Sequence, residues 1–187
     1  KGTKNCTVFK GHATFISDNM VRVEDVVLEA KQFFINVGAR ASIPEIPGID
    51  QVPFLDNSSI MELDYLPKHL IIFGGGYIGL EFSQIYRRFG SEVSVIQRGD
   101  KLISREDNEV SQAVQEVLEK EGIKIYTNTE DCKVEKKNDT IGVTMKCHGQ
   151  PCEIKGSHLL LALGRTPNTS DLGLENTKIE TDSRGFI

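Results

Sequence analysis

The sequence lacks several features that would assign it to a specialised class of protein. It has no tryptophan, only four cysteines among its 187 residues, and fewer basic than acidic residues, 22 against 27. A formal net charge of -5 leaves no basic footprint for nucleic acid. The longest apolar run, Leu159–Leu163, falls far short of the ~20 residues that span a bilayer. The polar start, Lys1–Cys6, has no apolar signal-peptide core behind it. Four cysteines in a chain of this length do not form a typical secreted disulfide framework. We therefore expect a cytoplasmic protein with reduced thiols.

The first third of the chain is rich in predicted strands. Segments Thr7–Phe15, Met20–Val23 and Val26–Val37 carry β-branched and aromatic residues with partial alternation. The proline-rich stretch Ile43–Gly48 then opposes helix formation and resembles a crossover between domains. A domain border is predicted at Leu66–Lys68.

Beyond that border, strand and helix patterns alternate. Predicted strands lie at His69–Phe73, Glu92–Gln97, Ile123–Tyr126, Cys132–Lys137, Thr140–Cys147 and His158–Leu163. A first helix is indicated by Ile78, Phe82, Ile85 and Phe89 at helical spacing, with Gly90 at its end. A second helix is predicted after Ser104, which would form a capping box with Asp107. Its predicted buried stripe consists of Val110, Ala113, Val114, Val117 and Leu118. The order β-α-β-α-β followed by an antiparallel meander predicts an α/β, Rossmann-like fold.

The first βα turn carries a glycine motif, Gly74-x-Gly76-x-x-Gly79. Its context is complete, because it follows an apolar strand and opens an amphipathic helix. Gly74 permits the tight turn, Gly76 lets a pyrophosphate approach the backbone, and Gly79 lets helix and strand pack closely. The helix start offers free N–H groups and partial positive charge to phosphates. The motif predicts dinucleotide binding; a glycine-rich turn kept for packing alone is the alternative.

The end of the second strand bears on the choice between NAD and NADP. Enzymes specific for NAD commonly place a carboxylate there, to bind the ribose hydroxyls. This chain instead has Gln97, Arg98 and Gly99 before its first carboxylate, Asp100. Arg98, with Arg105 as a second clamp, could hold a 2′-phosphate through charge-assisted hydrogen bonds. NADPH is favoured over NADH, and the alternative is that both arginines are solvated surface charges.

A second cysteine pattern, Cys147-x4-Cys152, stands in a proline-containing turn between predicted strands. A zinc site would need further ligands, so no metal site is predicted. We interpret the two residues as ordinary thiols that could meet across strands and oxidise.

Three stretches together resemble the class I pyridine nucleotide-disulfide oxidoreductases, which include dihydrolipoamide dehydrogenase, glutathione reductase and mercuric reductase. They are Gly74–Glu81 (GGGYIGLE), Gly90–Arg98 and Ala162–Asn168 (ALGRTPN). The run Arg98–Asp107 is most similar to the mercuric-reductase-like branch, and Gly38–Arg40 with the prolines that follow resembles the family's passage out of its first FAD segment. The resemblance covers essentially the whole chain.

The resemblance implies a domain plan. Residues 1–65 would be a β-rich FAD-domain segment and crossover, residues 66–165 the NAD(P)-binding domain, and residues 166–187 the start of a returning FAD-domain segment. The family's FAD motif and redox disulfide would lie upstream of Lys1, and its dimerisation domain downstream of Ile187. We therefore expect this chain to bind NAD(P) but little or no FAD and to lack turnover, and we expect the intact enzyme to be a homodimer.

The resemblance also assigns residues at the nicotinamide end. Tyr77 would cover the nicotinamide pocket, Glu81 would orient the carboxamide, and Gly164 would line the pocket. Otherwise, Tyr77 is a half-buried first-turn residue and Glu81 a charge favoured near a helix start. The predicted dinucleotide-binding set is Gly74, Gly75, Gly76, Tyr77, Ile78, Gly79, Gln97, Arg98, Arg105 and Gly164.

The implied activity is hydride transfer from NAD(P)H to FAD, and onward to a disulfide, a metal ion or oxygen in the intact enzyme. A free-standing NAD(P)-binding regulatory module without redox chemistry is the alternative from another class.

Overall fold

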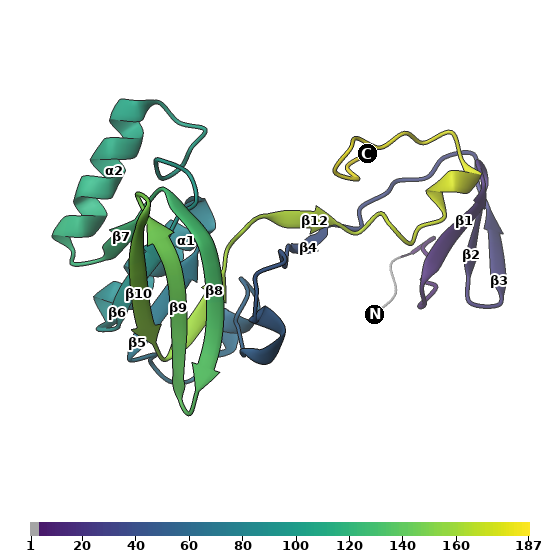
Figure 1. Cartoon of the computed structure of the whole chain (residues 1–187). Coiled ribbons are helices and arrows are strands. Elements are labelled where there is room, and N and C mark those ends of the chain that lie inside the picture. Colours follow the sequence, from purple (N-terminus) through teal and green to yellow (C-terminus); the bar gives the residue numbers. More distant parts are fainter. Residues whose placement is uncertain (1–3) are drawn as a thin grey trace. The chain divides into compact units, whose positions relative to one another are not determined.

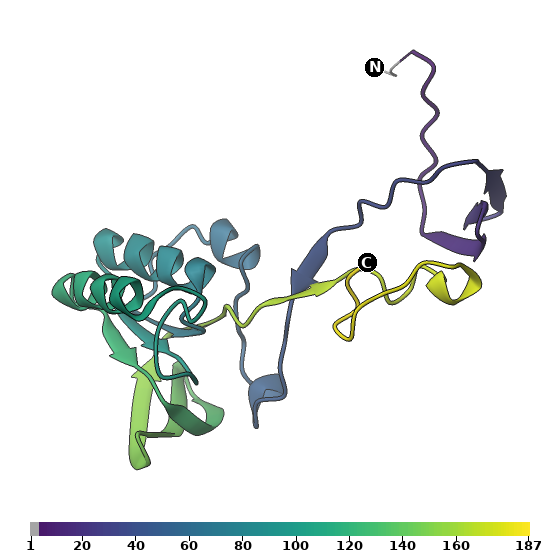
Figure 2. The same cartoon turned by 90° about the horizontal axis from the view of Figure 1, so that it is seen from above.

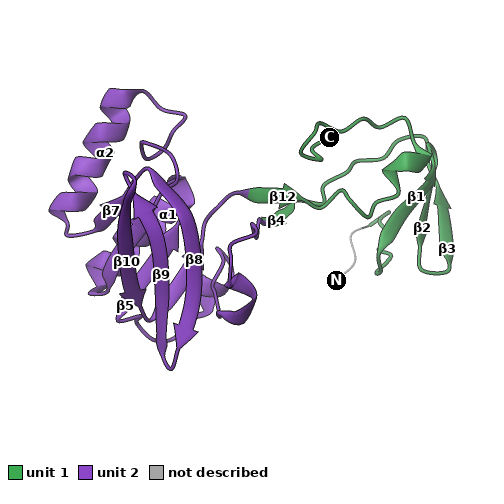
Figure 3. Ribbon diagram, in the orientation of Figure 1, with its two compact units in different colours: residues 1–40, 165–187 green, residues 41–164 purple. Residues whose placement is uncertain are grey.

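The computed structural model describes residues 4–187, which form two compact units (Figures 1 and 3). One unit comprises residues up to Arg40 together with Arg165–Ile187, and the other comprises Ala41–Gly164. Residues 41–65, which the domain boundaries expected from the sequence joined to the first segment, thus cluster with the larger unit. The assignment of the segments to FAD and NAD(P) domains stays a prediction.

The smaller unit is built on a three-stranded antiparallel meander. Its strands are β1 (Ala13–Ser17), β2 (Met20–Val23) and β3 (Val26–Glu29), packed around Phe15 and Val21. The predictions of strand from Thr7 and as far as Val37 were too long, because residues 7–12 and 30–38 form no strand. Phe33 and Ile35 of the second segment still pack against this core, so their apolar character reflects burial without strand pairing. A separate two-stranded ladder pairs β4 (Ala39–Ala41) with β12 (Arg165–Pro167).

The larger unit contains a four-stranded parallel sheet of order β11-β5-β6-β7. The strands are β5 (His69–Phe73), β6 (Glu92–Ile96), β7 (Lys124–Tyr126) and β11 (His158–Leu161). Helices α1 (Tyr77–Phe89) and α2 (Asn108–Lys120) connect the successive strands. Short 3-10 turns at Ile49–Gln51 and Ser59–Glu62 precede the sheet. The predicted βαβαβ order is confirmed.

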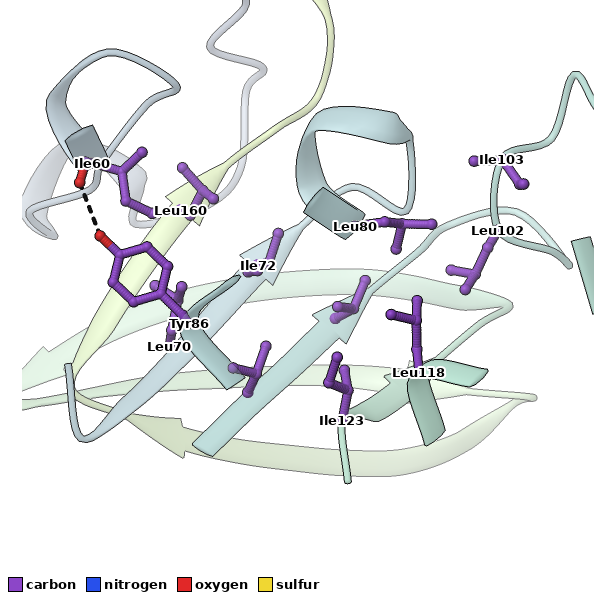
Figure 4. Packing of buried hydrophobic residues seen from close by; sticks show 12 residues of the cluster. Ile60, Leu70, Ile72, Leu80, Tyr86, Leu102, Ile103, Leu118, Ile123 and Leu160 are labelled. Atoms are coloured by element: carbon purple, nitrogen blue, oxygen red, sulfur yellow. Dashed lines mark hydrogen bonds between the residues drawn. The ribbon is translucent and has the colours of Figure 1, made fainter. Parts of the chain in front are cut away.

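Successive residues of the parallel strands face opposite sides, and both sides are buried. Leu70 and Ile72 pack with the helices, whereas Ile71 and Phe73 pack with a second sheet. This is why β5 has a continuous apolar run rather than an alternating one. On the helix side, the Tyr86 hydroxyl donates a 2.9 Å hydrogen bond to the Ile60 carbonyl (Figure 4). Tyr86 is the largest side chain in this core, and the bond gives a partner to its hydroxyl, the only polar atom of that side chain.

The second sheet is an antiparallel meander made of β8 (Thr129–Lys137), β9 (Thr140–Cys147) and β10 (Gln150–Gly156). The sequence predicted the first two strands, but the stretch with Pro151 and Cys152, expected to be a turn, belongs to β10. This strand lies at the edge of its sheet, where proline is tolerated. Its inner face covers the side of the parallel sheet opposite the helices, as Figure 2 shows. Asn138, with φ 54°, lies in the predicted turn between β8 and β9. The larger unit is therefore a three-layer α/β/β structure.

Two details of the helices differ from the sequence interpretation. Asp107, not Ser104, is the N-cap residue of α2, and it makes no side-chain capping hydrogen bond. The predicted stripe is buried at Leu118 but half exposed at Val110 and Val117. Helix α1 likewise buries Leu80, Ser83 and Tyr86, not the Ile85 and Phe89 face. Only one face of each helix packs against the parallel sheet, and the other apolar side chains of the helix stay exposed.

Two histidines at the amino ends of the parallel strands predict a pH-dependent stability. Burial lowers the pKa of both His69 and His158 below 6.5, and each ring is hydrogen-bonded, to Ser94 at 2.9 Å and to Tyr65 at 3.1 Å. The unfolded chain therefore binds more protons below about pH 6.5, so the free energy of unfolding should fall as the pH is lowered through that range. Urea denaturation at about pH 7.5 and about pH 5.5 measures this loss, and a His69→Gln, His158→Gln double variant should reduce it. If the free energy of unfolding depended equally on pH in both proteins, its loss could not be attributed to His69 and His158.

Candidate functional site

The glycine turn lies at the carboxyl edge of the parallel sheet, where three strands end together. The Gly74 N–H donates to the Ile96 carbonyl at 2.9 Å, and the Ala162 N–H donates to the Phe73 carbonyl at 2.8 Å. The turn between β5 and α1 thus lies between the ends of β6 and β11. Open α/β sheets bind their ligands at this edge.

Each glycine of the motif meets a different steric demand. Gly74 has φ 112°, and a Cβ there would lie 2.3 Å from the Ala162 carbonyl oxygen. A Cβ at Gly79 would lie 2.1 Å from the Gly74 carbonyl oxygen, so α1 contacts the turn directly. A Cβ at Gly76 would meet no atom within 4 Å. Gly74 and Gly79 are therefore required by packing, whereas the space beside Gly76 is left open.

The open side of the turn presents unpaired amides. Gly76, Tyr77 and Ile78 are exposed at the start of α1, and within residues 4–187 no acceptor takes their backbone N–H groups. The first helical hydrogen bond runs from the Leu80 N–H to the Gly76 carbonyl at 3.0 Å. Free N–H groups at the positive end of a helix bind anions, and phosphate above all.

Gln97 holds the inner side of the same turn. Its side-chain Oε1 accepts a 2.9 Å hydrogen bond from the Gly75 N–H, which fixes the amide and leaves Nε2 as a donor. The following loop closes over Gly75 as well, because the Ile103 N–H donates to the Gly75 carbonyl at 2.8 Å and Leu102 is fully buried. The turn is therefore preorganised by contacts that the sequence pattern did not indicate.

Arg98 and Arg105 follow β6 on exposed loop positions. Neither guanidinium has an ion-pair or hydrogen-bond partner among the residues that the structure describes. Arg98 directly follows Gln97, so both side chains extend from the strand end next to the glycine turn. Arg105 lies close enough to Tyr77 for its charge to act on the pKa of that phenol.

Tyr77, in the first turn of α1, has a partner that sequence reasoning missed. Its hydroxyl donates a hydrogen bond to the Glu106 carboxylate, and this bond raises the pKa of Tyr77 above its usual value. Lys101 donates from Nζ to the Glu106 carbonyl at 2.6 Å and so stabilises the loop that carries the carboxylate. Glu81, one helical turn after Tyr77, lines a groove between α1 and α2. Tyr77 and Glu106 line the same groove. This groove encloses about 570 Å³ and has a largely aliphatic lining.

Gly164, the last predicted site residue, follows β11 with φ 109° and is exposed. Its carbonyl accepts a 3.0 Å hydrogen bond from the Ser42 N–H. The structure thus groups Gly74–Gly79, Gln97 and Arg98 around the ends of β5 and β6, whereas Gly164 lies three residues beyond the end of β11.

Among residues 4–187, no group of three or more histidine, cysteine or acidic side chains is arranged to hold a metal ion. All four cysteines are free thiols. In the same part of the chain, none of the helices combines the length and apolar character needed to cross a membrane.

A glycine turn at the carboxyl edge of a parallel sheet, opening a helix with free amides, is typical of proteins with a Rossmann-like fold. The sequence matches the family Pyridine nucleotide-disulphide oxidoreductase over residues 1–187. The chain belongs to this family.

The relatives include reductases and a dehydrogenase. A mercuric reductase of Bacillus cereus is 37% identical over 180 residues, which cover 96% of this chain and 28% of the relative. A dihydrolipoyl dehydrogenase of Bacillus subtilis is 34% identical over 193 residues, covering 100% of this chain and 40% of that protein. The solved structure of the HOCl-induced flavoprotein disulfide reductase RclA from Escherichia coli superposes with a TM-score of 0.84. It is 32% identical, with 96% of this chain and 41% of that chain covered. The chain thus spans less than half the length of these relatives.

Proposed function

We propose that the larger unit binds the nicotinamide dinucleotide of an FAD-dependent oxidoreductase, with the pyrophosphate on the turn Gly74–Gly79. The observation that supports this most directly is the open space beside Gly76 together with the unpaired amides of Gly76, Tyr77 and Ile78. Phosphate oxygens would accept hydrogen bonds from these amides at the positive end of α1.

NADPH is the dinucleotide that the end of β6 favours. Gln97 uses its acceptor oxygen on Gly75, so only its Nε2 donor remains for the ligand. Arg98 adds an unpaired cation next to it. A ribose 2′-phosphate needs donors and positive charge, whereas a free ribose hydroxyl pair is best bound by a carboxylate acceptor.

At the nicotinamide end, Tyr77, Glu81 and Gly164 are proposed to position the ring. Glu106 holds the phenol of Tyr77 by a hydrogen bond, so this ring has a defined resting place at the helix start. Glu81 lies four residues later on the same helix face and would accept a hydrogen bond from the carboxamide. These residues orient a cofactor and move no proton in this proposal.

In the intact enzyme, the bound dinucleotide would supply a hydride to FAD, which the remainder of the protein would hold. The electrons would then pass to a disulfide or a metal ion, as the names of a flavoprotein disulfide reductase and of mercuric reductases among the relatives suggest. We further propose that the intact enzyme is a cytoplasmic homodimer. The role of this chain is to bind and orient the nicotinamide.

Calorimetric titration of the purified chain with NADPH and NADH tests the proposal. We expect saturable binding of one equivalent, tighter for NADPH, and an absorbance spectrum without a flavin band. A chain that binds neither dinucleotide would overturn the proposed function. A chain purified with bound flavin would overturn the expectation that this chain binds NAD(P) but little or no FAD.

Reversing the charge of Arg98 should weaken NADPH selectively. The Arg98→Glu variant loses a charge-assisted contact worth about 1.5–3 kcal/mol, which corresponds to a roughly 10- to 100-fold rise in the Kd for NADPH. The Kd for NADH should change little, because its ribose carries no 2′-phosphate. Asp100→Lys, which changes charge at a nearby exposed position, serves as the control for general electrostatics. Equal weakening of both dinucleotides by Arg98→Glu would reject the 2′-phosphate role.

A further inference from the structure

Three of the four free thiols gather at one end of the β8-β9-β10 meander. Cys132, Cys147 and Cys152 are half-buried, and all three pack against the apolar cluster beneath this sheet together with Tyr126. The proposed dinucleotide site uses none of them. A group of half-buried thiols with no assigned function is the strongest unexplained feature of the larger unit.

The strand register places two of these thiols on the same face and close together. Cys147 of β9 lies opposite Gln150 of β10, and Cys152 lies opposite Met145. Because side chains alternate along a strand, Cys147, Met145 and Cys152 all point to the inner face. Cys147 and Cys152 are therefore diagonal neighbours across a two-residue turn.

This diagonal spacing favours a bridging ion over a disulfide. Diagonal neighbours have Cα atoms roughly 7–8 Å apart, whereas a relaxed disulfide needs about 4.4–6.8 Å. Two thiolates bound linearly to one ion have their sulfurs two metal–sulfur bonds apart. With bonds as long as the ~2.3 Å of zinc–thiolate bonds this is roughly 4.6 Å, against about 2.05 Å in a disulfide, so the bridged pair accepts a wider backbone spacing. The oxidation suggested from the sequence is thus the less favourable use of this pair.

We propose that Cys147 and Cys152 form a two-coordinate binding site for a soft monovalent d10 cation of the copper(I) class. Two S–H bonds break and two S–metal bonds form, so that two protons are released to solvent and no electron is transferred. Thiolate ligands select soft ions of this kind. Zn²⁺ needs four ligands, and the described residues offer no group of even three suitable side chains.

Protons compete with the cation for the sulfur atoms of the pair, and the surroundings of the pair affect this competition. Burial and the neighbouring Cys152 thiol raise the pKa of Cys147 to about 12, and Cys132 adds to the shift. Cys147 is therefore protonated near neutrality when no ion is bound, and affinity for the cation should rise with pH. Tyr126 is a titratable neighbour of the pair, and burial together with both thiols raises its pKa. Asp131 acts on Cys132 and pairs with Lys146 at 2.7 Å.

Silver(I), as the nitrate in chloride-free buffer, is the probe, because it is soft and does not oxidise thiols. Calorimetry of the full chain in two buffers of different ionisation enthalpy should give one tight equivalent and the release of about two protons. Cys147→Ser and Cys152→Ser should each lose this equivalent, whereas Cys132→Ser and Cys6→Ser should keep it. Loss in a control variant, retention in Cys152→Ser, or comparable binding of Zn²⁺ would overturn the proposal.

Alkylation of the unmutated chain removes any dependence on the folding of the variants. One equivalent of silver(I) should protect Cys147 and Cys152 from N-ethylmaleimide and leave the alkylation of Cys6 and Cys132 unchanged, as peptide mass mapping would show. Protection of a different pair would overturn the assignment. Neither experiment depends on dinucleotide binding, so this site and the proposed function fail independently.

Discussion

Replacing Gly76 with valine should abolish tight dinucleotide binding while leaving the fold intact. The backbone at this position is extended, with φ -85° and ψ 177°, and a new side chain would enter space with no protein atom within 4 Å of its Cβ. That space is where the pyrophosphate is proposed to lie. The loss of one charge-assisted amide contact costs about 1.5–3 kcal/mol, so the Kd should rise by at least roughly 10- to 100-fold for both NADPH and NADH.

The matched control for Gly76→Val is Ser104→Val, which adds the same β-branched side chain at an exposed position of the neighbouring loop. Its Kd should stay near that of the unmodified chain. Thermal unfolding should give closely similar Tm values for all three proteins. A Gly76→Val chain that retains its affinity would place the pyrophosphate elsewhere.

Substitution of Gly79 by alanine should instead destabilise the fold. The added Cβ would lie 2.1 Å from the Gly74 carbonyl oxygen and 3.4 Å from the Ala162 side chain, so α1 must move away from the strand ends. Overpacking of this kind costs about 1–3 kcal/mol or more, which outweighs the ~1 kcal/mol that alanine gains over glycine inside a helix. Each lost kcal/mol lowers the Tm of a chain of this size by roughly 2–4 °C.

Gly142→Ala is the control for this effect. Gly142 lies in β9 with the nearest atom 3.4 Å from its Cβ position, an ordinary contact with the flexible Glu135 side chain. This variant should unfold near the Tm of the unmodified chain. If Gly79→Ala proves as stable as Gly142→Ala, close contact between α1 and the turn is not what requires glycine at position 79.

The sequence predicted the arrangement of the larger unit well because its signals are local. The apolar run of His69–Phe73 reflects burial on both faces, which only a strand between two layers experiences. Gly90 has φ 109° and ends α1, as a left-handed C-terminal glycine does. The period-two pattern around Asn138 identified the antiparallel hairpin for the same local reason.

The features that could not be predicted depend on contacts between distant segments. Nothing in the chain near Gln97 indicates that its oxygen binds the Gly75 N–H, 22 residues earlier. The bond between Tyr77 and Glu106 likewise requires the loop after β6 to fold back over α1. Periodicity also selected Ile85 and Phe89 as a buried face, since an apolar stripe does not identify which surface will cover it.

The free amides at the start of α1 are proposed to bind the pyrophosphate, and amide chemical shifts test this binding most directly. In an ¹⁵N-labelled chain titrated with NADPH, the largest shifts are expected at Gly76, Tyr77 and Ile78, with Arg98 responding to NADPH more strongly than to NADH. Shifts confined to the opposite end of the sheet, where Tyr65 and His158 line a cavity of about 920 Å³, would contradict the account.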